Sequence, residues 1–351
     1  MSTESSPLAR RSIPQHVIVR FGALVSAAAL MAGCSSNPVD APPPTITPAQ
    51  AADSPPAMPS PPGTVLPLAS SAQSATFDEV TRALVVLAPA APGRSALTVF
   101  GSGGQTAVVP LDDAATAMAG GDGVVFLAST GGYLRVDLAS RAVSRFDVEG
   151  RPDLEFTAIA RRADGRMVLG SADGAVLTLA DDTAVAAEAR LFARVDQIVT
   201  QGDTAVVLDR SQTSVTTLNI DGTAKQQALR AGNGATTMVA DAAGGVLVAN
   251  TRGGELLVYG VDPLILRQRY PVPDAPYGLA ASATGWAWVA QTATNSVVGY
   301  DLASGIPVEK VRYPTVQQPN SLAFDDASGT LYVVSGAGAG VQVIESAEGV
   351  Q

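Results

Sequence analysis

One hairpin pattern sets the architecture of this chain: Pro319-Asn320-Ser321-Leu322-Ala323-Phe324-Asp325, then Ser328-Gly329, then Thr330-Leu331-Tyr332-Val333-Val334. A mixed strand leads into a turn, and a run of apolar residues follows the turn. Short apolar runs bounded by turn residues are typical of strands buried on both faces, and glycine suits a tight turn that needs positive φ. The stretch therefore predicts a β-hairpin whose second strand lies in a core.

The apolar second strand recurs at a regular interval along the chain. Seven copies begin 40, 43, 38, 41, 40 and 45 residues apart, at 84–87, 124–127, 167–169, 205–208, 246–248, 286–289 and 331–334. Each copy is followed by a Gly- or Asn-containing turn, a third strand and a more polar outer strand. Four strands in about 40 residues, with almost no helical periodicity, predict an all-β, seven-bladed β-propeller of four-stranded blades over residues 64–351.

The last repeat ends after its third strand, at 341–344, and so lacks an outer strand. Residues 64–69 precede the first repeat and are free to supply it. Pairing the first segment with the last repeat would remove an exposed sheet edge, so we expect the ring to close in this way. The hairpin at 319–334 and the segments 276–280 and 299–305 also resemble the YVTN-type repeat of bacterial surface propellers.

The N-terminal segment has the features of an export signal. Arg10, Arg11 and Arg20 precede an uncharged run, 21–33, and the run ends in Leu30-Met31-Ala32-Gly33-Cys34. This ending resembles the lipobox of bacterial lipoproteins, which implies a signal peptide over 1–33 and acylation of Cys34. Thirteen helical residues rise only about 20 Å, which is short for a bilayer core of about 30 Å. An uncleaved anchor is the alternative, and the secretory and twin-arginine routes both stay open.

Residues 34–63 are expected to form a flexible, disordered tether. Ten of the 28 residues from 35 to 62 are proline, and most of the others are Ala, Ser and Thr. Such a segment favours extended polyproline II and could reach about 90 Å at ~3.1 Å per residue, or about 30 Å if it behaves as a coil. The layout of lipobox, tether and propeller resembles the conserved mycobacterial lipoproteins of the LppL type. That resemblance implies a lipid-anchored envelope protein that faces outward from the cell membrane, and it brings no catalytic motif.

Composition removes most familiar catalytic chemistry. The only histidine is His16 and the only cysteine is Cys34, so histidine bases, Cys-His nucleophiles, zinc sites, haem ligation and disulfides have no residues after position 34. Neither a cofactor nor a metal is expected. Without residues 1–33, which hold three arginines and one glutamate, 19 basic and 31 acidic side chains remain, a net charge of about −12. That charge argues against a nucleic-acid partner.

The candidate binding residues are expected on the propeller face that carries the turns between second and third strands and the connections between blades. Residues in or beside the turns are Arg210, Arg252, Gln291 and Asn295, and those in the connections are Asp153, Glu155, Asn233, Asp274, Gln317, Gln318 and Asn320. Two arginines from adjacent blades could clamp a carboxylate or phosphate. The alternative is that all of these side chains are ordinary solvated loop residues.

The leading interpretation is a non-enzymatic binding or scaffolding module for a protein or glycan partner in the envelope, attached to the membrane through Cys34. The alternative is a metal-dependent hydrolase of the lactonase or esterase kind. It would need converging carboxylates on the innermost strands, most of which read as Ala, Leu, Val and Ile. Quinone-cofactor redox chemistry is a third possibility, although only two tryptophans occur.

Overall fold

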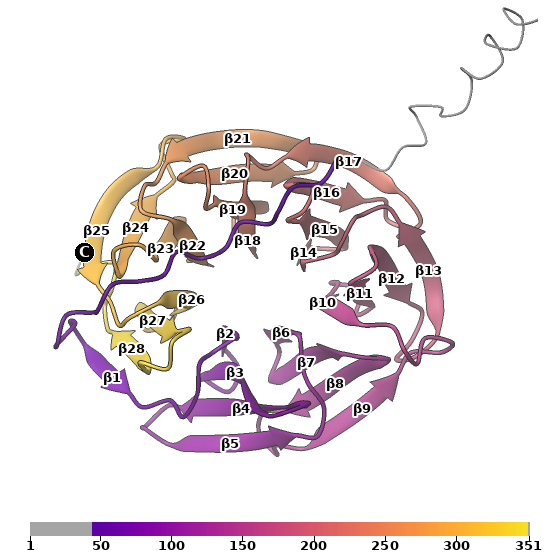
Figure 1. The fold of residues 1–351 in the computed structure, drawn as a ribbon, viewed down its shortest axis with the longest axis horizontal. Helices are drawn as coiled ribbons and strands as arrows, with labels where there is room; N and C mark the ends of the chain where they lie inside the picture. Colours follow the sequence, from indigo (N-terminus) through magenta and orange to yellow (C-terminus); the bar gives the residue numbers. More distant parts are fainter. Residues whose placement is uncertain (1–43, 350–351) are drawn as a thin grey trace, which may run out of the picture. The chain divides into compact units, whose positions relative to one another are not determined.

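The computed structural model describes residues 44–349, and all regular structure in that part of the chain is β-strand. The strands form seven four-stranded antiparallel sheets around a central axis (Figure 1). The predicted seven-bladed β-propeller is confirmed. Blades 1 to 6 are the sheets β2–β5, β6–β9, β10–β13, β14–β17, β18–β21 and β22–β25, and blade 7 combines β26–β28 with β1.

The four strand positions of each blade have consistent bounds around the ring. The innermost strands are β2 (Ser74–Asp78), β6 (Ala117–Gly121), β10 (Phe156–Arg161), β14 (Gln197–Gln201), β18 (Ala235–Ala240), β22 (Pro276–Ala281) and β26 (Pro319–Asp325). The second strands are β3 (Ala83–Ala91), β7 (Val124–Ser129), β11 (Met167–Ser171), β15 (Thr204–Asp209), β19 (Gly245–Asn250), β23 (Trp286–Gln291) and β27 (Thr330–Ser335). The third strands are β4 (Arg94–Gly101), β8 (Gly132–Asp137), β12 (Ala175–Leu179), β16 (Ser214–Leu218), β20 (Glu255–Val261), β24 (Ser296–Asp301) and β28 (Val341–Ile344). The outer strands are β5 (Thr106–Leu111), β9 (Val143–Asp147), β13 (Val185–Arg190), β17 (Lys225–Arg230), β21 (Leu264–Pro271), β25 (Val308–Pro314) and β1 (Thr64–Leu66).

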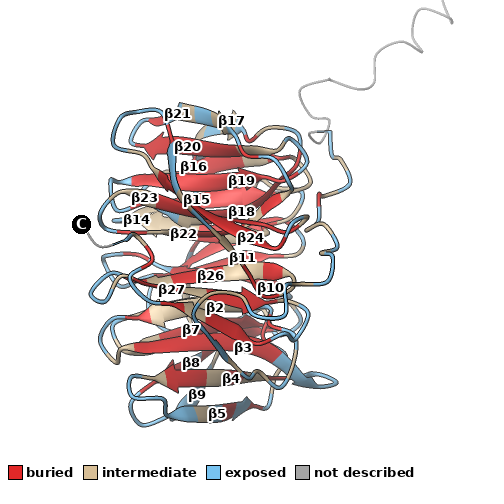
Figure 2. Ribbon diagram, turned by 90° about the vertical axis from the view of Figure 1, so that its left-hand side faces the viewer, coloured by how far each residue is buried: buried red, intermediate tan, exposed pale blue. Residues whose placement is uncertain are grey.

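The core lies between neighbouring blades. The second strands are buried along nearly their whole length, whereas outer strands such as β17 and β21 are largely exposed (Figure 2). Trp288 of blade 6 is fully buried and stacks on Phe324 of blade 7, with 5.9 Å between ring centroids. One blade therefore cannot bury its apolar faces alone, and each needs both neighbours.

The ring closes as the sequence predicts. β1 pairs antiparallel with β28, with Thr64 opposite Val343 and Leu66 opposite Val341. Leu66 also packs in a cluster that joins blade 7 to blade 1 through Leu84 and Val334. The N-terminal strand thus supplies the missing outer strand of the last blade, so that blade 7 has all four strands.

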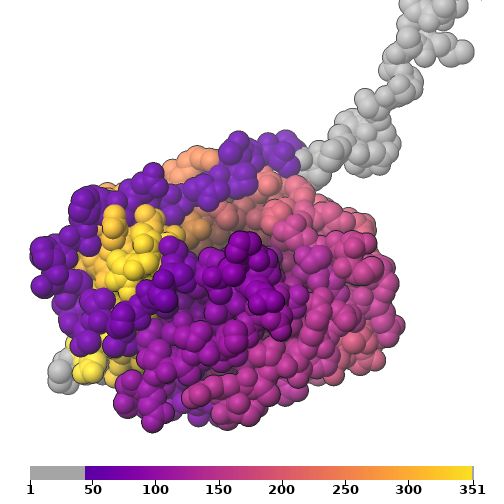
Figure 3. Space-filling model, turned by 60° about the horizontal axis from the view of Figure 1, so that its bottom comes forward, coloured from indigo at the N-terminus to yellow at the C-terminus, as the bar shows by residue number. Residues whose placement is uncertain are grey.

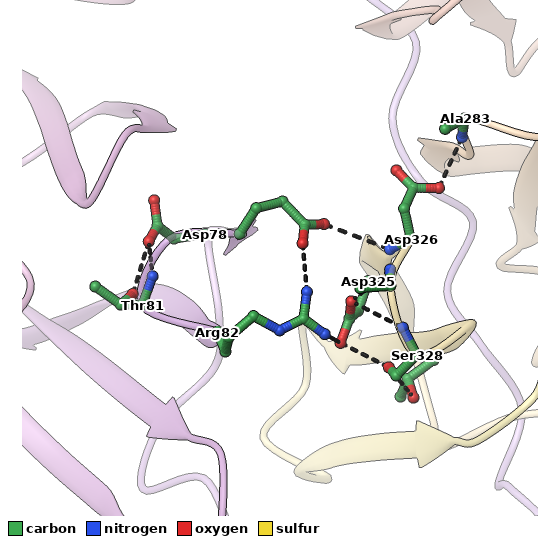
Figure 4. Close-up of polar contacts among 10 residues, drawn as sticks. Asp78, Thr81, Arg82, Ala283, Asp325, Asp326 and Ser328 are labelled. Carbon is green, nitrogen blue, oxygen red and sulfur yellow. Dashed lines mark hydrogen bonds and ion pairs between the residues drawn. The ribbon is translucent and has the colours of Figure 1, made fainter.

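A polar network ties the same two blades together at the first-to-second strand turns, on the face opposite the blade connections (Figure 4). Arg82 of blade 1 pairs with Asp325 of blade 7 and with its own neighbour Glu79. Asp325 also accepts a hydrogen bond from Ser328 Oγ at 2.6 Å. Burial opposes ionisation of Asp325, but the hydrogen bonds from Ser328 and Arg82 outweigh it and lower the pKa of this carboxyl.

Residues 44–56 differ from the predicted tether. They have no regular secondary structure, yet they lie along one face of the ring and cross blades 4 to 7 (Figure 1). We call residues 44–56 the strap. In this part of the segment predicted as a flexible tether, side chains of the propeller hydrogen-bond the main chain of the strap. Composition alone could not reveal this, since every sequence carries those main-chain groups.

The remaining N-terminal predictions lie outside the described residues. These are the signal peptide at 1–33, the lipidation site Cys34 and the first part of the tether. Within residues 44–349, no helix is long and apolar enough to cross a membrane.

Candidate functional site

Antiparallel topology places the second-to-third strand turns and the blade connections on one face of the ring, which we call the turn face. The strap lies on this face, as the indigo atoms in Figure 3 show. It covers one side of the face, and a hollow lies beside it. The sequence-predicted binding residues can therefore be sorted by whether they contact the strap.

The first half of the strap contacts the two predicted arginines. Arg210, in the β15–β16 turn, donates from Nη2 to the carbonyl oxygen of Ala49. Arg252, in the β19–β20 turn, donates from Nη2 to the carbonyl oxygen of Thr47 at 2.7 Å. The N–H of Ile46 donates to the carbonyl oxygen of Ser211 at 2.8 Å. The arginines of adjacent blades 4 and 5 thus each bind a different peptide carbonyl of the strap.

The second half of the strap contacts blades 6 and 7. Gln318 uses both ends of its amide: Nε2 donates to Ala52 O at 2.9 Å, and Oε1 accepts from Ser54 N at 3.0 Å. Asn295 Nδ2 donates to Pro55 O at 2.7 Å. Thr292 Oγ1 accepts from Ala52 N at 3.0 Å. Thr292 and Asn295 lie in the β23–β24 turn of blade 6, and Gln318 lies in the connection between blades 6 and 7.

Backbone conformation positions the two amides. Asn295 and Gln318 both have positive φ, at 48° and 58°, which residues other than glycine adopt rarely. The N–H of Gln318 donates to Asn295 Oδ1 at 3.0 Å. Asn295 therefore holds the Gln318 backbone with one end of its amide and the strap with the other. The strained turn is a local cost that this pair of hydrogen bonds offsets.

A half-buried carboxylate, Asp196, supports the arginine of blade 4. The N–H of Arg210 donates to Asp196 Oδ2 at 2.7 Å, and Arg194 Nε lies 3.4 Å from Asp196 Oδ1. Burial raises the pKa of Asp196, against the opposing effects of the Arg210 hydrogen bond and of the two guanidinium charges. Asp196 thus acts on the turn that carries Arg210 and makes no contact with the strap.

One strap side chain is enclosed by the propeller. Ala49 is only 5% exposed. It lies against Gly234 in the connection between blades 4 and 5, where an added Cβ would come within 3.0 Å of the Ala49 Cβ. The small side chain of Ala49 and the absence of one at Gly234 therefore let the strap approach the blade connection closely.

The other predicted residues have different surroundings. Gln291 is fully buried: its Nε2 donates to Pro273 O at 2.9 Å, and its Oε1 accepts from Arg312 and Ser296. The structure thus places it inside the blade rather than on the turn face. Asn233 is exposed and holds Arg252 through its carbonyl oxygen at 2.9 Å. Two further residues make no contact with the strap: Glu155, exposed on blade 3, and Asn320, which accepts a hydrogen bond from Gln318.

The remaining predicted residues lie in the blade connections, and only one of them contacts the strap. Gln317 Nε2 donates to Ser54 O at 3.3 Å, so it joins Gln318 in the strap contact. Asp153 and Asp274 are exposed on the turn face. Sequence reasoning missed Thr292 and the strap itself. The only signal for Thr292 in the sequence is its place in the turn region between Gln291 and Asn295, two of the predicted binding residues.

A cavity of about 860 Å³ runs along the innermost strands. Its charged lining residues are Asp122, Arg161, Arg162, Asp196 and Arg210. Arg162 pairs with Asp164 at 3.0 Å, and Arg161 lies 3.5 Å from Asp122. Nowhere in residues 44–349 do three or more His, Cys, Asp or Glu side chains gather as metal ligands could. The converging carboxylates that a metal-dependent hydrolase would need are therefore not assembled in the described cavity.

Comparisons with known proteins identify the fold. No family model and no curated protein match the sequence. Among solved structures, a chain of a mitotic checkpoint complex has a TM-score of 0.69 at 10% identity, covering 86% of this chain and 99% of that chain. Virginiamycin B lyase from Staphylococcus aureus has a TM-score of 0.66 at 12% identity, covering 80% and 98%. A streptogramin B lyase has a TM-score of 0.65 at 10% identity, covering 82% and 97%. The TM-scores show that this chain shares their β-propeller fold. At such low sequence identities, the similarity shows the fold alone.

Proposed function

We propose that the protein is a non-enzymatic binding module, held at the outer side of the cell membrane by lipid on Cys34, whose turn face binds a protein partner in the envelope. One observation carries this proposal: the turn face already holds an extended polypeptide, using side chains from blades 4 to 7. A glycan partner receives less support, because the observed contacts are with peptide groups.

Catalysis receives less support than binding. A histidine-to-alanine form of virginiamycin B lyase from Staphylococcus aureus is described as catalytically inactive. The only histidine of the present chain is His16, before the propeller. The described cavity also brings together no cluster of carboxylates. A shared fold with lyases is therefore no argument for lyase chemistry here.

The strap alters the geometry expected for the membrane anchor. If lipid is attached at Cys34, twelve residue steps separate it from Ile46, the first described strap residue that hydrogen-bonds the ring. Twelve residues in an extended polyproline II conformation span about 37 Å at ~3.1 Å each. The whole tether predicted from composition could have reached about 90 Å at the same rise. The proposed anchor therefore keeps the rim of the turn face within about 37 Å of the membrane while the strap is bound.

Site-specific photocrosslinking in membranes tests the proposal. A photoreactive residue at Asn233, exposed on the turn face, is expected to capture an envelope protein. The same residue at Val80, which is 68% exposed in the β2–β3 turn on the opposite face, serves as the matched control. Cys34→Ala is expected to move the chain from the membrane to the soluble fraction. Equal crosslinking from both faces, or a Cys34→Ala chain that stays in the membrane, would contradict the proposal.

A further inference from the structure

The propeller binds the strap mainly through hydrogen bonds to the main chain of the strap. Side-chain donors of the ring bind the carbonyl oxygens of five strap residues: Thr47, Ala49, Ala52, Ser54 and Pro55. Three strap N–H groups donate to the ring, those of Ile46, Ala52 and Ser54. Only two strap side chains hydrogen-bond the described ring: Ser54 Oγ donates to Thr292 O at 2.5 Å, and Gln50 Oε1 accepts from Arg210 Nη2 at 3.4 Å. Recognition of this kind depends on an extended backbone more than on particular side chains.

This pattern of contacts tolerates proline. Carbonyl contacts need no N–H from the bound segment, and proline is excluded only where an N–H must donate. The strap has Pro44, Pro48, Pro55 and Pro56, none of them at the three donating positions. Proline also holds a segment extended before it binds, which lowers the entropy lost on binding. The part of the turn face that binds the strap therefore suits a polyproline-type segment that has a few free N–H groups.

One position of the groove restricts side-chain size. Ala49 is enclosed against Gly234 and lies beneath the Arg210 contact. A larger or charged side chain at this position would collide with the connection between blades 4 and 5. Elsewhere the strap is more open, since Thr45, Gln50 and Asp53 are exposed. We therefore expect a bound segment to need a small residue at the position of Ala49 and to tolerate many side chains at the exposed positions.

From these contacts we propose that the part of the turn face on blades 4 to 7 is a docking groove for an extended, proline- and alanine-rich segment of a partner protein, and that the strap is its occupant in cis. This inference rests on the proposed binding function and names the class of partner. A partner segment binds by displacing the strap. The strap has the advantage of high effective concentration because it is covalently attached, so a free segment competes with it poorly.

Displacement would also change the reach of the propeller. With the strap bound, twelve residue steps link Cys34 to Ile46, the first described residue that hydrogen-bonds the ring. With the strap released, 29 steps link Cys34 to Gly63 before the β1 strand, and the reach at ~3.1 Å per residue rises from about 37 Å towards about 90 Å. Partner binding and distance from the membrane are thus coupled through one segment.

Binding of a peptide added in trans tests the groove. The probe is a fluorescent synthetic peptide with the sequence of residues 44–56, and the protein is the full chain purified in detergent. Ala49→Glu in the chain should expel the strap, because a charged side chain replaces a buried methyl group. Fluorescence anisotropy is then expected to show at least tenfold tighter peptide binding to the Ala49→Glu chain than to wild type. Thr45→Glu adds the same charge at an exposed strap position and should bind the peptide as wild type does.

Two further measurements assign the site. Gln318→Ala, added to the Ala49→Glu chain, is expected to weaken peptide binding at least tenfold, because Gln318 makes two main-chain contacts. A peptide that itself carries glutamate at the Ala49 position should not bind. Peptide affinity that is equal for all chains, or unaffected by Gln318→Ala, would overturn the groove. Unchanged circular dichroism would show that each variant is folded.

The outcome for the groove is separable from that for the proposed function. If photocrosslinking from Asn233 captures a partner while the peptide fails to bind the Ala49→Glu chain, the binding function stands and the groove assignment is wrong. If a soluble glycan but no peptide binds that chain, the partner class is wrong. If the peptide binds as expected and no envelope protein is captured, the groove stands and the proposed membrane partner falls.

Discussion

The strap and β1 both contact the ring, and the two contacts differ in kind. β1 joins blade 7 by main-chain pairing with β28, and Leu66 enters the core. The strap joins blades 4 to 7 mainly through side chains of the ring, and Ala49 is its only buried residue. β1 completes a sheet that would otherwise have an open edge, whereas the strap lies on a ring that is already closed. β1 is therefore part of a sheet, whereas the strap is bound to the surface of the ring.

The largest expected effect comes from disturbing the β1 contact. Gly63 has a φ of +84°, and an added Cβ would lie 2.0 Å from the carbonyl oxygen of Val343 in β28. Gly63→Ala should therefore lower the free energy of unfolding by about 3 kcal/mol, from backbone strain and from the collision at the seam. Urea denaturation followed by circular dichroism measures the change.

Gly93 offers the matched control. Its φ is +74°, but an added Cβ would meet nothing within 4 Å in the exposed β3–β4 hairpin. Gly93→Ala should cost only about 1 kcal/mol, from the positive φ alone. Equal losses for the two variants would mean that the β1 pairing contributes little to the closed ring.

A smaller effect is expected at the polar side of the same seam. Asp325→Asn removes the charge that pairs with Arg82 and should lower the free energy of unfolding by about 2 kcal/mol. The pKa of Asp325 is lowered in the folded state, so its stabilising effect is present above the ordinary pKa of 3.8 and is lost as pH falls through the folded pKa.

Thermal unfolding over a range of acidic pH values checks this prediction. The melting temperature of wild type should fall steeply below about pH 4, and that of Asp325→Asn should fall less. Asp112→Asn serves as a control. The Asp112 side chain is 94% exposed and lies 3.7 Å from Arg94, and an ion pair this exposed contributes little to stability. An Asp325→Asn variant with the acid sensitivity of wild type would rule out this pair as a pH-dependent part of the seam.

The smallest effect on stability is expected from the strap. Ala49→Glu should lower the free energy of unfolding by about 1.4 kcal/mol, which is the free energy of a tenfold preference for the bound strap, because the ring core stays intact. Limited proteolysis should instead cut the strap of this variant faster than that of wild type or Thr45→Glu. A large loss of global stability would show that the strap belongs to the fold, as β1 does.

The sequence predicted the ring well because burial leaves a periodic trace. The second strands from β3 to β27 each appear as a short apolar run, and these are the strands that neighbouring blades bury. Closure by residues 64–66 was also predictable, since the last repeat lacked a strand that only the N-terminal segment could supply. Both inferences rest on apolar area and on strand count, which a sequence displays directly.

The candidate site was predicted less completely. Arg210, Arg252 and Asn295 lie on the turn face and contact the strap. Gln291 lies at the same kind of turn, yet it points inward because Arg312 of β25, the outer strand of the same blade, pairs with its amide. A polar residue at a hairpin end can face either way, and the partner that decides its direction is distant in sequence.

The amino-acid sequence by itself determined the all-β architecture, the number of blades and the strand that closes the ring, because periodic apolar residues specify which surfaces must be buried. Tertiary structure alone decided that a proline-rich segment lies along the ring and which side chains hold it. The physical reason is that these contacts join side chains to peptide groups, and peptide groups are present in every segment of a chain. Only their positions in space distinguish the strap from a free tether.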